Sequence, residues 1–196
     1  MPTLPEFWLV RHGETEWSAS GRHTGLTDIP LTAAGEQHAR ALRSRLASHT
    51  FAHVWTSPLA RARRTCELAG FGDAAQVDAD LVEWDYGQYE GITTAQIRQD
   101  RPDWQLFRDG CPGGESLEAI GARADRVIAR LREASGNAIL FSSGHFLRVL
   151  AARWLGLEPA GGRLLLLGTA SLSILGYEHN NPAEPVLKLW NEQLPG

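Results

Sequence analysis

Short apolar runs alternate with longer amphipathic stretches along this chain. A continuous apolar run of a few residues is typical of a strand buried on both faces, whereas apolar positions every three or four residues are typical of a surface helix. The pattern predicts strands at 7–10, 51–56, 77–82, 138–141, 164–167, 171–177 and 186–190. It predicts helices at 33–47, 58–69, 116–133 and 146–155.

Strands that alternate with helices favour an α/β fold. We expect three layers, with a mainly parallel central sheet and helices on both faces. The chain, 1–196, is predicted to form a single domain, because 196 residues with 43% hydrophobic content suit one core of common size. In such sheets ligands bind beyond the carboxyl ends of the strands, so we expect the functional side chains to follow the strands.

Polar side chains follow each of the first four predicted strands. Arg11 and His12 follow the first strand, Arg61 lies near the end of the second, and Glu83 follows the third. The fourth strand is followed by a Ser-Ser-Gly-His run at 142–145. Two guanidinium groups beside an imidazole supply many donors and few acceptors, which suits a tetrahedral dianion such as phosphate.

These residue types predict a reaction as well as a ligand. A neutral imidazole, here that of His12, can attack phosphorus directly and form a covalent phosphohistidine. Glu83 can protonate the departing alkoxide if a desolvated site keeps it in the acid form. Because phosphoryl transfer needs mainly positioning and charge neutralisation, fixed guanidinium groups can replace a metal ion. We therefore predict no metal and no cofactor, and a small phosphorylated metabolite as partner.

Several segments carry longer motifs around these positions. Segment 9–15 reads LVRHGET, and segment 83–91 reads EWDYGQYEG. Together with 22–28, 31–36, 56–62 and 110–116, they resemble the histidine phosphatase superfamily, also called the phosphoglycerate mutase-like family, over most of the chain. Segments 83–91 and 110–116 look most like its sugar-bisphosphatase and acid-phosphatase branch.

The resemblance implies a role for each matching catalytic residue. His12 would be the phosphorylated nucleophile. Arg11 and Arg61 would hold the phosphoryl oxygens. Glu83 would act first as acid and then as base.

Further residues are expected around the pocket. The resemblance implies that Thr24 and Gly25 line it near the transferring group, and Ser18 stands where many relatives have Asn. Ser18 can still donate one hydrogen bond. Candidates for substrate selection, chosen because they lie in or beside loops that should border the pocket, are His23, His145, Arg148 and His179.

The family's second histidine is missing from its usual position. Close relatives read Ser-His-Gly-His after the fourth strand, whereas Ser143 stands at the histidine position here. Serine is shorter and cannot carry a positive charge, and losing one such electrostatic donor costs on the order of 100-fold in rate. His145 lies two residues on, where we expect the next helix to aim it elsewhere.

Three explanations of Ser143 stay open. It is a deliberate inactivating substitution, a natural variant of weak activity, or the mark of a protein that binds phosphorylated ligands without turnover. We favour the first, because the rest of the predicted site is intact. The predicted function is a metal-independent phosphomonoester hydrolase for a small, sugar-like phosphate, crippled by Ser143. The alternatives are a phosphoglycerate mutase-type phosphotransferase and a non-catalytic phosphate-ligand-binding protein.

The amino-acid composition limits the classes of partner that the protein can bind. With 19 basic and 23 acidic residues the net charge is -4, which argues against binding nucleic acid or an anionic membrane. Lys188 is the only lysine, so a phosphate loop of the Gly-Lys type is excluded. The preference for arginine has two interpretations that composition leaves open, a compositional bias or bidentate anion sites.

Cysteine content and hydropathy bear on compartment and assembly. Cys66 and Cys111 lie far apart in a chain without a secretory leader, so we expect free thiols and a cytoplasmic location. No apolar run approaches the roughly 20 residues that span a bilayer. The apolar run at 164–167 and the late strands offer an edge for a homodimer.

Overall fold

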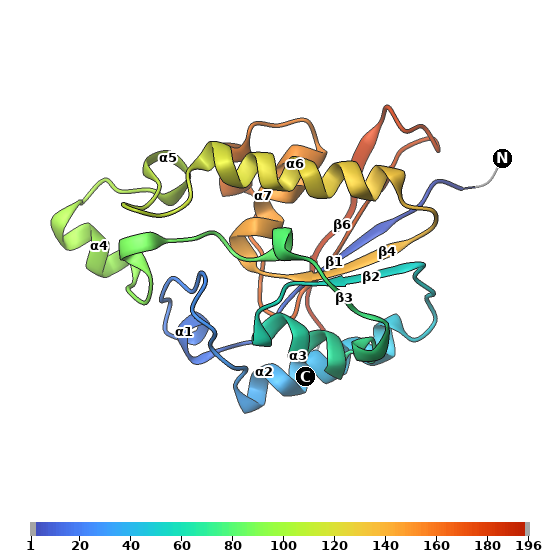
Figure 1. The fold of residues 1–196 in the computed structure, drawn as a ribbon, viewed down its shortest axis with the longest axis horizontal. Coiled ribbons are helices and arrows are strands. Elements are labelled where there is room, and N and C mark those ends of the chain that lie inside the picture. Colours follow the sequence, from blue (N-terminus) through green and yellow to red (C-terminus); the bar gives the residue numbers. More distant parts are fainter. Residues whose placement is uncertain (1–2, 195–196) are drawn as a thin grey trace.

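A mixed sheet of six strands forms the centre of the computed structural model, which describes residues 3–194 (Figure 1). In spatial order the strands are β3 (Gln76–Val77), β2 (His53–Thr56), β4 (Ala138–Ser142), β1 (Phe7–Arg11), β5 (Leu172–Tyr177) and β6 (Pro185–Glu192). Neighbours from β3 to β1 are parallel, whereas β5 is antiparallel to both β1 and β6. The predicted mainly parallel α/β sheet is confirmed.

Helices cover both faces of this sheet, as predicted (Figure 1). One face carries α2 (Ala33–Leu46) and α3 (Ala60–Leu68), and the other carries α6 (Leu117–Glu133) and α7 (Gly144–Trp154). Three short helices lie beyond one end of the sheet: α1 (Glu16–Ala19), α4 (Thr94–Asp100) and α5 (Leu106–Asp109). The sequence pattern did not predict these three, because they are too short to show a helical period.

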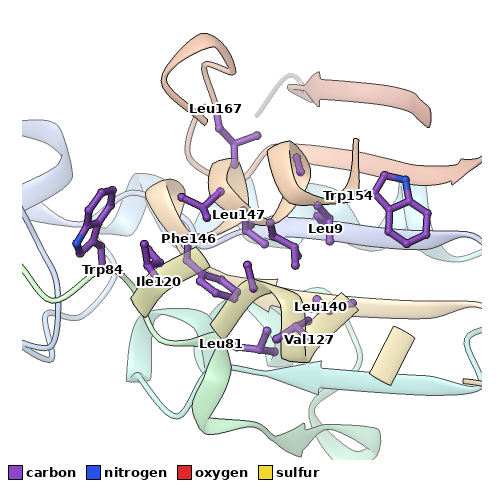
Figure 2. Packing of buried hydrophobic residues seen from close by; sticks show 14 of the residues in the cluster. Leu9, Leu81, Trp84, Ile120, Val127, Leu140, Phe146, Leu147, Trp154 and Leu167 are labelled. Atoms are coloured by element: carbon purple, nitrogen blue, oxygen red, sulfur yellow. The ribbon is translucent and has the colours of Figure 1, made fainter. Parts of the chain in front are cut away.

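Strand β1 is buried on both faces and joins the two halves of the core. Phe7 and Leu9 belong to the apolar cluster under α6 and α7, whereas Trp8 and Val10 belong to the cluster over α2 and α3. Figure 2 shows Leu9 together with Leu147 of α7 in the first cluster. Full burial of one such side chain stabilises the fold by roughly 1.5–3 kcal/mol. The residue that follows this rigid strand is therefore held firmly.

Two helix starts show how local chemistry sets the boundaries. Thr32 caps α2 by accepting a hydrogen bond from the Gly35 N–H (3.0 Å), as its sequence position predicts. Helix α3 begins at Ala60, two residues later than predicted. Ser57 stays extended instead, because its N–H donates to the Phe141 carbonyl (2.9 Å) and so continues the pairing of β2 with β4.

The predicted strand at 77–82 is wrong beyond its first residue, because β3 ends at Val77. The Asp78 carboxylate accepts a hydrogen bond from the Asp80 N–H (2.9 Å), which starts a 3-10 turn. It also pairs with Arg130 of α6 (2.7 Å). These two contacts turn the chain away from the sheet edge and lead it towards Glu83.

The predicted strand at 164–167 is also wrong. A 3-10 helix, Pro159–Leu164, leads into an irregular segment, and the side chains of Leu164 and Leu166 are exposed. Both edges of β5 are already paired, with β1 and with β6, so the segment has no strand to join there. None of the helices between residues 3 and 194 combines the length and the apolar character that crossing a bilayer requires.

Candidate active site

A cavity of about 220 Å³ opens at the carboxyl ends of β1 and β4. Seven of the predicted site residues line it: Arg11, His12, Ser18, His23, Thr24, Glu83 and His145. Three others are not among the lining residues: Gly25, Arg61 and Ser143. The segments that the sequence singled out therefore meet at one cavity, although not every predicted side chain lines it.

His12 is the residue directly after β1, and it is almost completely buried. Its N–H donates to the Ser142 carbonyl (2.9 Å), which continues the pairing of β1 with β4 and fixes its backbone. The ring Nδ1 lies 2.7 Å from the Gly13 carbonyl oxygen. A carbonyl can only accept, so Nδ1 carries the proton and Nε2 keeps a free lone pair.

The charge state of His12 follows from its surroundings. Burial, and after it the positive charges of Arg61 and Arg11, hold the pKa of His12 well below its usual value of 6.5. The imidazole is therefore neutral at pH 7. A buried, neutral imidazole with an available Nε2 lone pair has the properties of a nucleophile.

Arg11 lies against the start of α7. Its Nη1 donates to the Leu167 carbonyl (2.5 Å), while its Nε is buried and has no hydrogen-bond partner among residues 3–194. Gly144 allows the approach, because a Cβ at that position would lie 3.1 Å from Nε and Cζ of Arg11. The guanidinium is thus clamped between α7 and the 165–170 segment, with donors left over for the cavity.

Arg61, in the first turn of α3, is fully buried. Its Nη1 donates to the Thr27 carbonyl (2.9 Å) and its Nη2 to the Gly25 carbonyl (2.7 Å). The Thr24 carbonyl lies 3.2 Å from the same Nη2. The predicted pocket residues Thr24 and Gly25 therefore wrap around this guanidinium with their backbone.

Neither arginine forms a direct ion pair with a described residue, although the Glu83 carboxylate acts on both from a distance. Within the described part of the chain, their hydrogen-bond partners are neutral carbonyls, and Nε of each is buried without a partner. Burial lowers the pKa of both guanidinium groups, but arginine remains charged at neutral pH. An unpaired buried charge costs several kcal/mol, so this site favours an anionic ligand.

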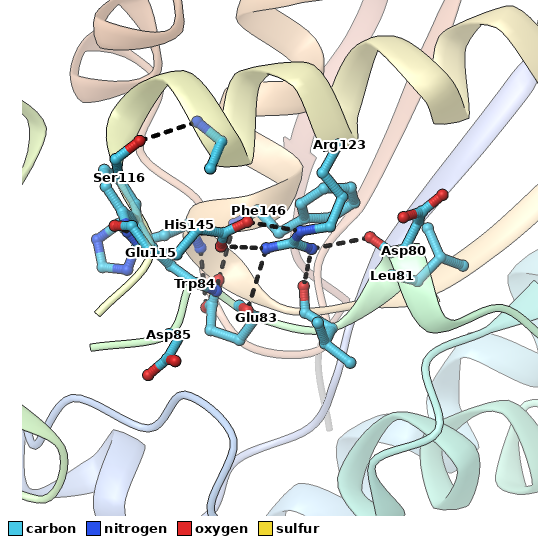
Figure 3. A network of polar contacts seen from close by, with 12 residues as sticks. Asp80, Leu81, Glu83, Trp84, Asp85, Glu115, Ser116, Arg123, His145 and Phe146 are labelled. Atoms are coloured by element: carbon cyan, nitrogen blue, oxygen red, sulfur yellow. Dashed lines mark hydrogen bonds and ion pairs between the residues drawn. The ribbon is translucent and has the colours of Figure 1, made fainter. Parts of the chain in front are cut away.

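Glu83 lies in the loop after the 3-10 turn and is 4% exposed. Its Oε1 accepts hydrogen bonds from the N–H groups of Trp84 (2.9 Å) and Phe146 (2.8 Å). Its Oε2 accepts one from the His145 N–H (3.0 Å). The carboxyl group therefore caps the first turn of α7, as Figure 3 shows.

Another buried arginine, Arg123 of α6, holds the Glu83 loop in place (Figure 3). It forms an ion pair with Glu115 (2.6 Å) and donates to the backbone carbonyls of Val82 (2.6 Å) and Glu83 (3.2 Å). The position of Glu83 thus depends on contacts with α6 and α7, and not on a strand.

Ser143 occupies the residue before α7 without capping it. Its Oγ is buried and has no hydrogen-bond partner in the described part of the chain. Ser143 is not among the residues that line the cavity, although the neighbouring Gly144 and His145 are.

The polar groups of the remaining predicted residues are largely engaged in hydrogen bonds or ion pairs within the protein. The Ser18 hydroxyl is engaged with the Thr15 backbone, accepting from its N–H (2.9 Å) and donating to its carbonyl (3.0 Å). The His23 Nδ1 donates to the Ile92 carbonyl (2.8 Å), and burial lowers the His23 pKa. His179 lies at the exposed turn after β5, where it pairs with Glu184, and does not reach the cavity.

Sequence reasoning missed several residues that line the cavity, namely Arg22, Tyr86, Thr94 and Leu167. Tyr86 is buried, and its hydroxyl lies 2.6 Å from Nδ1 of His145. It stands in the 83–91 motif, three residues after Glu83, and that position was the available signal. Arg148, which the sequence did predict, lies one helical turn after His145 and also faces the cavity.

The fold and the site define a class of enzyme, and comparison with known proteins agrees. The sequence profile of the histidine phosphatase superfamily (branch 1) matches residues 7–193. The chain belongs to this superfamily, as a phosphoric monoester hydrolase.

Two relatives and one solved structure span almost the whole chain. An acid phosphatase of Mycobacterium tuberculosis is 42% identical over 191 residues, covering 95% of this chain and 94% of the relative. Sedoheptulose 1,7-bisphosphatase of Saccharomyces cerevisiae is 34% identical over 255 residues, with 96% and 94% covered. A solved structure of a Mycobacterium tuberculosis open reading frame has a TM-score of 0.91 at 39% identity, covering 96% of this chain and 98% of that one.

Proposed function

We propose that the protein hydrolyses phosphate monoesters of small, sugar-like metabolites through a phosphohistidine at His12, without a metal ion. The observation that carries the proposal is the pair of buried guanidinium groups, Arg11 and Arg61, which have no direct ion-pair partner among residues 3–194 and lie beside a neutral imidazole. A phosphoryl dianion supplies the missing negative charge. It also accepts charge-assisted hydrogen bonds from nitrogen donors that the protein leaves free.

In the first step, Nε2 of His12 forms a bond to phosphorus, and the bond from phosphorus to the ester oxygen breaks. The departing alkoxide takes a proton from Glu83 and leaves as an alcohol. We assign that proton to Oε2, because Oε1 already accepts two backbone hydrogen bonds and Oε2 accepts one.

In the second step, the ionised Glu83 removes a proton from a water molecule. The water oxygen bonds to phosphorus, and the bond from phosphorus to Nε2 of His12 breaks. Inorganic phosphate leaves, and Glu83 is again protonated. Arg11 and Arg61 neutralise the charge of the phosphoryl group throughout, which is the contribution that a metal ion makes elsewhere.

The cavity supports a small substrate. Its volume of about 220 Å³ is below the roughly 300–1,000 Å³ of sites for drug-sized ligands. The name of one relative, a sugar bisphosphatase, supports a sugar-like leaving group.

Ser143 is proposed to weaken this activity. A neutral serine hydroxyl gives the phosphoryl group no positive charge, and Ser143 is not among the residues that line the cavity. Replacing Ser143→His is therefore expected to raise the rate of hydrolysis by up to about 100-fold.

The test compares the native chain with the Ser143→His variant on a panel of sugar phosphates and p-nitrophenyl phosphate, with a chelator present. Rapid quenching should trap an acid-labile phosphate on the enzyme, and His12→Ala should abolish both hydrolysis and the adduct. If Ser143→His hydrolyses none of the panel and forms no adduct, the proposed function is wrong. Hydrolysis that stops when the chelator is added would contradict the metal-free reaction.

The same observation on Ser143 favours a second candidate, a non-catalytic protein that binds phosphorylated ligands. Calorimetry would show that such a protein binds phosphate monoesters, but no phosphohistidine would form.

The third candidate, a phosphoglycerate mutase-type phosphotransferase, would transfer the phosphoryl group to an added alcohol acceptor faster than to water. The adduct assay separates the binding protein from the two enzymes, and product analysis separates the hydrolase from the mutase.

Assembly and compartment also remain proposals. The exposed side chains of Leu164 and Leu166 support a homodimer, to be checked by light scattering coupled to size-exclusion chromatography. Cys66 and Cys111 are free thiols, and burial raises the pKa of each to about 12. Unreactive free thiols agree with a cytoplasmic location, and the net charge of -4 with the absence of a nucleic-acid partner.

A further inference from the structure

The ring of His145 forms part of the cavity wall, although its position at the start of a helix suggested that it would point elsewhere. Helix α7 begins at Gly144, so that His145 lies in the first turn, directly over the carboxyl ends of β1 and β4. Its Nδ1 is 2.6 Å from the hydroxyl oxygen of Tyr86. Tyr86 lies in the loop that also carries Glu83, so the contact joins this loop to α7.

The proton positions in this pair follow from its burial. Burial holds the pKa of Tyr86 well above its usual value, so its hydroxyl keeps its proton, and burial holds the pKa of His145 well below 6.5, so its ring is neutral. Within the described chain the Tyr86 hydroxyl has no other hydrogen-bond partner. The Tyr86 O–H therefore donates to Nδ1 of His145, since otherwise a buried donor would stay unpaired.

This hydrogen bond decides what His145 offers to a ligand. A neutral imidazole that accepts at Nδ1 carries its proton at Nε2. Among residues 3–194, no group accepts a hydrogen bond from that Nε2–H, and the ring lines the cavity. His145 therefore offers an unused Nε2–H donor, and it belongs to the wall of the same cavity as His12.

The direction of the His145 ring is further fixed by its neighbours. Its backbone N–H is tied to Oε2 of Glu83 (3.0 Å). The ring makes an edge contact with Tyr86 and a tilted contact with Phe107, with centroid distances of 5.9 and 5.6 Å. A donor held this firmly needs little reorganisation when charge develops on a ligand.

We propose that His145, oriented by Tyr86, donates from Nε2 to the phosphoryl group and so supplies the hydrogen bond that the side chain at position 143 cannot. The inference rests on the proposed function and extends it. His145 is in this account a catalytic residue, because it touches the phosphoryl oxygens. Tyr86 is a positioning residue, because it acts only through the His145 ring.

The test compares one substitution in two backgrounds. His145→Phe removes the donor but keeps a planar ring of similar size. In the native chain we expect it to lower kcat and to weaken binding of orthovanadate, each by about 100-fold, because no other donor replaces it. In the Ser143→His background we expect a loss of less than about tenfold, because the new imidazole supplies a donor to the same group.

Three controls separate this role from a structural one. His179→Phe, at the exposed turn after β5, should change neither readout. His145→Gln, whose amide can donate, should restore part of the loss seen with Phe. Tyr86→Phe should lower kcat and leave KM nearly unchanged, because the ring of His145 remains but its proton is no longer confined to Nε2.

Equal losses from His145→Phe in both backgrounds would overturn the inference, because a structural defect does not depend on residue 143. No loss in the native chain would overturn it as well. If Ser143→His is active and forms the His12 adduct, either result leaves the proposed function standing. If no variant binds orthovanadate or forms the adduct, the proposed function itself fails, and this inference with it.

Discussion

Two buried arginines in this molecule have opposite surroundings. Arg123, in α6, forms an ion pair with Glu115 at 2.6 Å and also donates hydrogen bonds to backbone carbonyls of the loop that carries Glu83. Arg61, in α3, is at least as deeply buried, yet within residues 3–194 its hydrogen-bond partners are carbonyl oxygens alone. A buried charge that has an ion-pair partner has a structural role, whereas a buried charge without one indicates a binding site for an ionic ligand. The degree of burial alone would not distinguish the structural arginine from the ligand-binding one.

The largest expected effect concerns the structural arginine. Arg123→Leu leaves the Glu115 carboxylate without its partner, and breaking a buried pair costs about 3–5 kcal/mol of unfolding free energy. The double substitution Arg123→Leu with Glu115→Leu should recover much of that loss, because no charge is then left unpaired. Urea denaturation of the three chains measures both effects. A single variant as stable as the native chain would show that the pair does not hold the Glu83 loop.

The second effect concerns the ligand-binding arginine. Arg61→Gln should weaken orthovanadate binding and lower hydrolysis by about 100-fold, because one fixed positive charge is removed from the phosphoryl site. The same substitution should change stability little, because the removal of a buried charge without a direct partner offsets the loss of the hydrogen bonds to the Thr27 and Gly25 carbonyls. Calorimetry and urea denaturation of one protein sample test both. A variant that is both destabilised and fully active would reverse our distinction between the two arginines.

The smallest effect is the dependence of stability on pH. Burial lowers the pKa of His12, His23 and His145 below 6.5, so the unfolded chain takes up protons that the folded chain refuses. Stability should therefore fall as the pH drops below about 6.5, by at most about 1.4 kcal/mol per pH unit for each group. His179, whose pKa is raised by Glu184, acts in the opposite direction but is exposed.

Urea midpoints at pH 7.5 and 5.5 measure this slope. Carboxylates with a lowered pKa, such as Glu36 and Asp80, lose their contribution only below about pH 4.5 and do not interfere. Arg61→Gln should give a shallower slope, because the positive charge of Arg61 is one cause of the lowered His12 pKa. An unchanged slope in that variant would mean that burial and Arg11 are enough to keep the folded His12 from taking up a proton at pH 5.5.

The sequence could predict those parts of the site that a strand or a cap places directly. His12 follows the last residue of β1, and a buried apolar run with an abrupt polar end indicates that position without tertiary information. Thr32 as the cap of α2 is equally local, because the contact spans three residues. The mainly parallel sheet followed from the alternation of such elements.

The remaining features depend on contacts between distant segments. Glu83 is placed by amides of α7 about 60 residues away, so no strand at 77–82 was needed to bring it to the cavity. The inward direction of His145 depends on the hydroxyl of Tyr86, in another loop. The unpaired state of Arg61 is visible only when every neighbour is known.

Glu83 ties the reaction to the mechanics of one helix. Two amides of α7 bond to a carboxyl group that, in the proposed cycle, loses a proton and regains it. An ionised carboxylate attracts the positive end of a helix more strongly than a neutral acid does. In the proposed cycle, the ionised carboxylate therefore anchors the first turn of α7 more strongly than the acid does, so the strength of this anchor changes twice in every turnover.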